Sequence, residues 1–218
     1  FGAIVSEYKN APGHEDWPHV DSFAAARNAS FALATGDYCF WCDTDDILES
    51  GAELIRQHAE RGGYAAYLYP YKILGKGVNI LRERLISRGS GKWIYPVHEC
   101  FDFAIQPIQS VQDDRVVITH LPHLDKSGSN ERNLRILRSM KKDGSLTLGH
   151  QFHLVQSLRA TGQQSDSTGE AVALLKEKDP ALSGRGVYDL LNLTARSWHA
   201  LPEVDMCAAL MKLSDDTV

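Results

Sequence analysis

The chain has 218 residues, of which 43% are apolar and 23% charged, and its formal net charge is −5. These values favour a soluble globular protein with one α/β domain and a smaller helical one. The negative charge argues against a dedicated nucleic-acid binder. The sequence contains no run of 18 apolar residues, so we do not expect a membrane span.

The first predicted helix lies between Ser22 and Gly36. Asp21 or Ser22 can cap its start, its alanine-rich interior favours helix, and Gly36 fits just past its end. An apolar strand is predicted at 38–42 and a second helix at about 50–61. This order of elements predicts a mostly parallel sheet covered by helices.

An acidic run, Asp43-Thr44-Asp45-Asp46, directly follows the strand at 38–42. Asp43 and Asp45 are two apart, so in an extended segment their side chains would point the same way. Two such carboxylates form a site for Mg²⁺ or Mn²⁺, which often also bind the phosphate oxygens of a substrate. The alternative is an acidic turn in which Asp45 or Asp46 caps the next helix.

The character of the chain changes after a further predicted strand at 115–119. From residue 126 onward, Leu134, Leu137 and Met140 recur at helical spacing. Helices are predicted at 130–144, 146–162 and 168–180, with a further pair at 188–201 and 203–213. Their spacing suggests degenerate tetratricopeptide-like pairs, so we expect domains at 1–125 and 126–218.

Four cysteines are present, at positions 39, 42, 100 and 207. Cys39 and Cys42 have the spacing of a redox motif, but that motif works at a helix N-terminus and these two residues lie in a predicted strand. We therefore expect reduced thiols, which favour a cytoplasmic location.

Two segments carry a family resemblance: FAAARNASFALATGDYCFWCDTDDIL (23–48) and RERLISRGSGKWIYPVHECF (82–101). In this order they resemble the inverting GT-A glycosyltransferases of family two, in the bacterial and viral branch with tetratricopeptide-like helices. Ile118-Thr119-His120 is a third match. The resemblance implies a Rossmann-like GT-A domain over 1–125 followed by a tetratricopeptide-like region over 126–218.

The resemblance also implies roles for individual residues. Asp43, Asp45 and His120 match the metal ligands of the family, and Glu99, with His98 beside it, takes the place of the catalytic base. Residues 82–93 match a mobile loop near the donor sugar. The residues expected to bind the donor are Arg27, Asn28, Asp43, Thr44, Asp45, Arg84 and Trp93.

The expected reaction moves a sugar from a nucleotide-diphosphate sugar, by default a UDP-sugar, to an acceptor hydroxyl. A divalent metal (Mn²⁺ or Mg²⁺) would stabilise the leaving diphosphate, and a carboxylate base would take the proton of the acceptor. The sequence leaves the acceptor open: a glycan, a lipid, a peptide or a modified nucleic-acid base would each fit.

One departure from the family concerns the start of the chain. Residues 1–6 read as the third strand of the domain, so the two βα units that bind the nucleotide base are expected in a missing N-terminal segment or a partner chain. This departure leaves a non-catalytic scaffold as an alternative. A haloacid-dehalogenase-like phosphatase is another, because an apolar strand followed by Asp-x-Asp also begins that superfamily.

Overall fold

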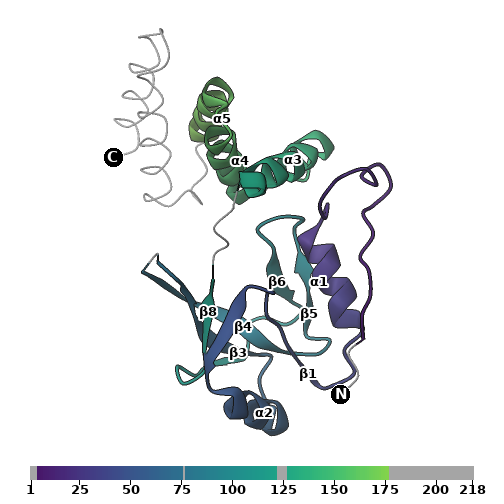
Figure 1. Cartoon of the computed structure of the whole chain (residues 1–218), viewed down its shortest axis with the longest axis vertical. Helices are drawn as coiled ribbons and strands as arrows, with labels where there is room; N and C mark the ends of the chain where they lie inside the picture. Colours follow the sequence, from purple (N-terminus) through teal and green to yellow (C-terminus); the bar gives the residue numbers. More distant parts are fainter. Residues whose placement is uncertain (1–3, 76, 122–126, 177–218) are drawn as a thin grey trace. The chain divides into compact units, whose positions relative to one another are not determined.

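The computed structural model of the chain describes residues 4–75, 77–121 and 127–176. The chain divides into two compact units, residues 1–125 and 126–218. The first unit is a mixed α/β structure and the second is helical in its described part (Figure 1).

The predicted first helix is confirmed as α1 (Phe23–Ala32), but its predicted end at Gly36 is wrong, because the C-cap is Leu33. Ser22 is its N-cap, because its side chain accepts the backbone N–H of Ala25 at 3.1 Å. Asp21, the other candidate cap, is instead buried and accepts the hydroxyl of Tyr8 at 2.7 Å. Its carboxylate therefore organises the loop that leads into α1.

A six-stranded sheet forms the centre of the first unit, with strand order β1-β4-β3-β8-β2 and β7 paired to β3. Its strands are β1 (Tyr38–Phe40), β2 (Asp46–Ser50), β3 (Ala66–Ile73), β4 (Val78–Ser87), β7 (Ser110–Gln112) and β8 (Val117–His120). The predicted strands at 38–42 and 115–119 correspond to β1 and β8.

The expectation of a mostly parallel sheet is corrected by the pairing of these strands. Only the β3–β7 and β3–β8 pairs are parallel, while β1–β4, β3–β4 and β2–β8 are antiparallel. The short connection between β3 and β4 is the physical reason, because a hairpin joins antiparallel neighbours whereas a parallel pair needs a long crossover. The sheet is therefore mixed.

The segment 82–93, expected as a mobile loop, is largely regular structure. It contains the second half of β4 and the start of β5 (Gly91–Ile94), joined by a turn in which the Ser90 N–H donates to the Ser87 carbonyl at 3.1 Å. β5 pairs with β6 (Cys100–Phe103) as a separate two-stranded sheet beside α1 (Figure 1). Residues 4–6, expected in a strand, are not in one, and 1–3 lie outside the described residues.

Two apolar clusters hold the elements of the first unit together. One joins α1 and the β5–β6 pair to the sheet, and its buried members are Ala24, Trp41, Ala66, Ile86, Trp93 and Phe103. The other lies under α2 (Ala52–Arg61), the helix predicted at 50–61, and its buried members are Tyr67, Tyr69, Tyr71, Leu85, Val116 and Ile118.

A buried polar contact fixes α2 on the second cluster. His58 Nδ1 lies 2.9 Å from the Tyr69 hydroxyl, and its Nε2 lies 3.2 Å from Asp113 Oδ2. Arg115 donates to both oxygens of Asp113, which lowers the pKa of that carboxyl to about 2. The ionised form of Asp113 is therefore the one that the fold stabilises.

The described part of the second unit consists of α3 (Ser127–Asp143), α4 (Leu148–Ala160) and α5 (Gln164–Lys176). Leu134, Leu137 and Met140 are all buried, as their helical spacing predicted. The helices predicted at 188–201 and 203–213 lie outside the described residues. The described helices confirm an α-helical region, and its likeness to tetratricopeptide repeats stays a prediction.

Gly91 sits where β5 and β6 approach each other most closely. A Cβ added there would lie 2.1 Å from the Asp102 carbonyl oxygen, which is backbone and cannot move aside. We predict that Gly91→Ala lowers the free energy of unfolding by about 1–3 kcal/mol, measured by urea denaturation. Gly36→Ala, which meets only an ordinary contact at 3.6 Å, is the control; equal effects of the two would contradict the prediction.

The low pKa of Asp113 predicts an acid-dependent loss of stability. A carboxyl whose folded pKa is depressed contributes stability above its unfolded pKa, which is near 4, and loses it as the pH falls toward about 2. Asp113→Asn should therefore flatten the dependence of the free energy of unfolding on pH between 4 and 2. Asp114→Asn, next to it in the chain, should leave that dependence in place.

Candidate functional site

The acidic run forms a turn between β1 and β2. The N–H of Asp46 donates to the Asp43 carbonyl at 3.0 Å, and the N–H of Asp43 donates back to Asp46 Oδ2 at 3.0 Å. The segment is therefore not extended, and the expectation that Asp43 and Asp45 point the same way is corrected. Asp43 contacts Arg27, whereas Asp45 lies beside His120.

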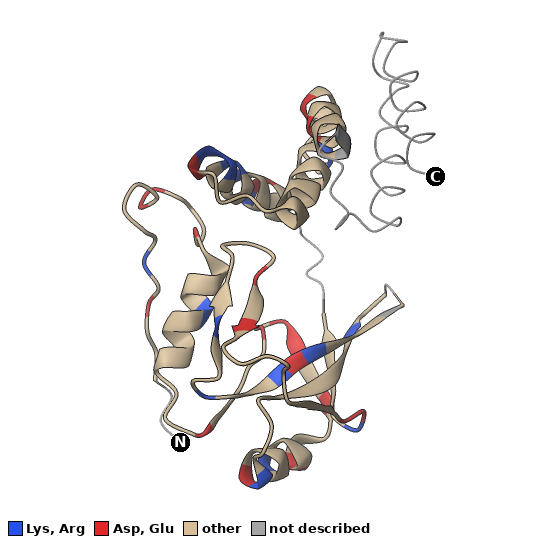
Figure 2. Cartoon of the chain, turned by 180° about the vertical axis from the view of Figure 1, so that it is seen from behind, with Lys and Arg blue, Asp and Glu red and all other residues tan. Residues whose placement is uncertain are grey.

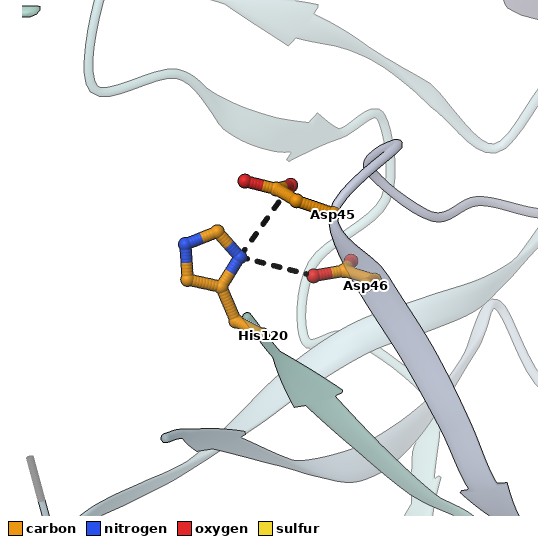
Figure 3. A group of neighbouring side chains, drawn as sticks. All are labelled: Asp45, Asp46 and His120. Atoms are coloured by element: carbon orange, nitrogen blue, oxygen red, sulfur yellow. Dashed lines mark hydrogen bonds and ion pairs between the residues drawn. The ribbon is translucent and has the colours of Figure 1, made fainter. Parts of the chain in front are cut away.

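Asp45, Asp46 and His120 form a group that could hold a metal ion, the metal-type group (Figure 3). His120 Nδ1 lies 3.5 Å from Asp45 Oδ1 and 3.3 Å from Asp46 Oδ1. Pairing of β2 with β8 produces this meeting, because Asp46 stands opposite His120 in the register. One ligand atom from each residue lies within 4.8 Å of the others. Two carboxylates and an imidazole are a ligand set that several divalent cations accept.

Asp46 is the most deeply buried member, with its side chain 0% exposed. Arg84 Nη1 donates to its Oδ2 at 2.9 Å, and the Tyr71 hydroxyl donates to its Oδ1 at 3.0 Å. Burial of the Tyr71 hydroxyl is the main reason why its pKa lies well above the usual value, and the hydrogen bond to the Asp46 carboxylate is the second. The negative charge of Asp46 is thus stabilised from several sides.

Arg84 was expected to bind the donor, but it lies in the core of the first unit. Its side chain is 1% exposed, and its guanidinium carbon lies 3.8 Å from the ring centroid of Trp41 and 4.2 Å from that of Tyr71. Buried between these rings and paired with Asp46, Arg84 supports the acidic turn and is not open to a ligand.

Trp93 and Asn28 also have structural partners. Trp93, expected to contact the donor, is only 2% exposed and packs at right angles to Trp41 with 5.0 Å between the ring centroids. The Asn28 amide donates to the Trp93 carbonyl at 2.8 Å and accepts its N–H at 2.9 Å. This reciprocal pair attaches β5 to α1, so both residues build the framework of the site. Thr44, by contrast, is exposed in the acidic turn.

Arg27 lies between two carboxylates that come from distant parts of the chain. Its Nε donates to Glu99 Oε1 and its Nη2 donates to Asp43 Oδ1, each at 2.8 Å. The two negative charges raise the pKa of the guanidinium even though burial opposes this. The side chain of Arg27 therefore bridges Glu99, the expected base, and Asp43 of the acidic turn.

His98 and Glu99 belong to a turn with unusual backbone geometry. His98 has φ 53° and Tyr95 has φ 71°, values that are rare for residues other than glycine. His98 is exposed, whereas the Glu99 side chain is 15% exposed. Such backbone conformations cluster at functional sites, where surrounding contacts hold them.

The basic residues near the site do not form a free positive patch. In Figure 2, blue and red segments of the ribbon show that basic and acidic residues follow one another along the long strand β4. Arg82 lies 3.4 Å from Glu83, Arg84 is paired with Asp46, and Arg88 donates to the Gly36 carbonyl. Arg82 and Arg84 are therefore paired with carboxylates, whereas Arg88 is bonded to a neutral backbone carbonyl.

The thiols in the described part of the chain are free, with Cys39 buried and Cys42 and Cys100 exposed. Burial raises the pKa of all three, which disfavours the reactive thiolate. This agrees with the expectation of a non-redox Cys39 and Cys42. Cys207 lies outside the described residues.

Comparison with protein-family models found no match, and comparison with curated protein sequences found none either. Among the described residues, none of the helices combines the length and the apolar character needed to cross a membrane.

Asp46 and Tyr71 are residues of the candidate site that the sequence analysis did not predict for it. Asp46 was considered only as a helix cap, yet it starts β2 and lies in the metal-type group. Its sequence signal was weak, because Asp46 meets His120 only through the register of the β2–β8 pair, which the local sequence does not reveal. Tyr71 carried no local signal.

The two carboxylates of the metal-type group should respond differently to neutralisation. Asp46→Asn leaves the buried guanidinium of Arg84 without its partner, and we predict a loss of about 3–5 kcal/mol in the free energy of unfolding. Asp45 is 21% exposed, so Asp45→Asn should cost less than about 1 kcal/mol. Urea denaturation of both variants checks this, and equal losses would contradict it.

Proposed function

We propose that the chain is a metal-dependent inverting glycosyltransferase that takes its sugar from a nucleotide-diphosphate donor. The observation that carries the proposal is the continuous set of contacts from the metal-type group to the expected base. Asp46 accepts a hydrogen bond from the backbone N–H of Asp43, the Asp43 carboxylate accepts one from Arg27, and Arg27 donates another to Glu99. Three hydrogen bonds therefore connect the metal-type group with the carboxylate of Glu99 within one unit.

The residues of the metal-type group, Asp45, Asp46 and His120, would hold Mn²⁺ or Mg²⁺. A divalent cation there would supply Lewis-acid stabilisation of the diphosphate leaving group. Both carboxylates belong to the part of the chain that resembles the metal–diphosphate motif of the family. The ligand set of the proposal thus differs from the expected one in that Asp46 stands in the place of Asp43.

Glu99 would act as general base in a single displacement. The acceptor hydroxyl oxygen forms a bond to the anomeric carbon while the bond from that carbon to the diphosphate oxygen breaks. The proton of the hydroxyl passes to Glu99, and the nucleoside diphosphate leaves with the electron pair. Attack from the face opposite the leaving group inverts the anomeric centre. His98, exposed beside Glu99, would contact the acceptor.

The test is Mn²⁺ binding followed by turnover of UDP-sugars. Wild type should bind Mn²⁺, gain thermal stability with UDP only when Mn²⁺ is present, and release UDP from a UDP-hexose. Asp45→Asn should weaken Mn²⁺ binding by about tenfold or more. Asp114→Asn, the same change at an exposed carboxylate outside the site, should leave binding unchanged.

The other outcomes separate the alternatives. Release of inorganic phosphate from a sugar phosphate, without release of UDP from a UDP-hexose, would contradict the proposal and favour a phosphatase. Binding of Mn²⁺ and UDP without any turnover would favour a non-catalytic scaffold. Glu99→Gln should abolish turnover while a nucleotide-dependent rise in melting temperature remains at saturating Mn²⁺, because the general base acts in the chemical step.

A further inference from the structure

The side chain of Arg27 donates both to the acidic turn and to the segment of the expected base. It lies in the middle of α1, a rigid element, and its two partners belong to segments far apart in the sequence. Asp43 belongs to the turn that opens β2, and Glu99 directly precedes β6. A guanidinium suits this task, because its planar fork places several N–H donors in fixed directions.

Two aromatic rings restrict where this guanidinium can go. Its carbon lies 4.5 Å from the ring centroid of Trp41 and 5.1 Å from that of Trp93, and the side chain is 20% exposed. Trp93 is itself attached to Asn28, the next residue of α1. The orientation of the Arg27 fork is therefore set by the core of the unit before any ligand binds.

The segment that carries Glu99 is attached to α1 at a second point. The N–H of Phe23, the first residue of α1, donates to the Pro96 carbonyl at 2.8 Å. Between this bond and the Arg27–Glu99 pair lies His98 with its left-handed backbone. Such a conformation persists only where surrounding contacts hold it, and α1 supplies these contacts.

We propose that Arg27 is a positioning residue that couples the carboxylate of Glu99 to the metal-type group through Asp43. Asp43 completes the connection, because its N–H donates to Asp46 Oδ2. The inference rests on the proposed function and changes the role expected for Arg27, which was contact with the donor. Occupation of the metal-type group and placement of the base then depend on each other.

The first experiment is a double-mutant cycle on stability without metal. Arg27→Gln and Glu99→Gln should each lower the melting temperature by about 2–4 °C, and the double variant should lose no more than the larger single loss. Arg56→Gln on α2 removes an equal charge from an exposed position of the same unit. Its effect should add to that of Glu99→Gln.

The second experiment measures coupling to the metal. In wild type, Glu99→Gln should weaken Mn²⁺ binding about fivefold, measured by electron paramagnetic resonance, although Glu99 is not a member of the metal-type group. In the Arg27→Gln background the same change should weaken binding less than about twofold. Arg27→Lys keeps the charge but not the fork, and should behave like Arg27→Gln.

These outcomes distinguish the coupling from the proposed function. If wild type binds Mn²⁺ but Glu99→Gln weakens binding equally in both backgrounds, the coupling is overturned and the proposed function stands. Rescue by Arg27→Lys would also overturn it, because charge alone would then suffice. If wild type binds no Mn²⁺ at all, the proposed function fails and the coupling fails with it.

Discussion

The buried ion pair between Asp46 and Arg84 is the interaction on which the rest of the first unit depends. Removing two charges from water costs several kcal/mol for each ion, so the pair is tolerated only with further hydrogen bonds. The Tyr71 hydroxyl and the backbone N–H of Asp43 donate these hydrogen bonds to Asp46. These partners come from β3, β4 and the acidic turn, so one carboxylate holds three segments in register.

The candidate site is a consequence of this arrangement. Once Asp46 is held at the start of β2, pairing with β8 brings His120 against it and leaves Asp45 at the partly exposed rim. Trp41, packed over Arg84, also carries the guanidinium of Arg27. The core therefore supports both halves of the site, the metal-type group and the Arg27–Glu99 pair, although Asp45 and Glu99 themselves lie in turns.

Local features of the fold were predictable because their causes are local. The cap at Ser22, the helix at 50–61 and the helical spacing of Leu134, Leu137 and Met140 all depend on residues within a few positions of one another. Burial of Arg84 and Trp93 was not predictable in the same way. A resemblance places such residues near a site but does not say which of their side chains are buried in the core next to it.

The sequence alone determined where most helices and several strands lie, and which carboxylates and histidine are available for a cation. Only the tertiary structure decided which of them meet. Asp43 and Asp45 are neighbours in the chain, yet a turn directs one to Arg27 and the other to His120. The physical reason is that strand pairing acts between distant segments, so the mixed sheet and the Asp46–His120 contact depend on a register that no local pattern encodes.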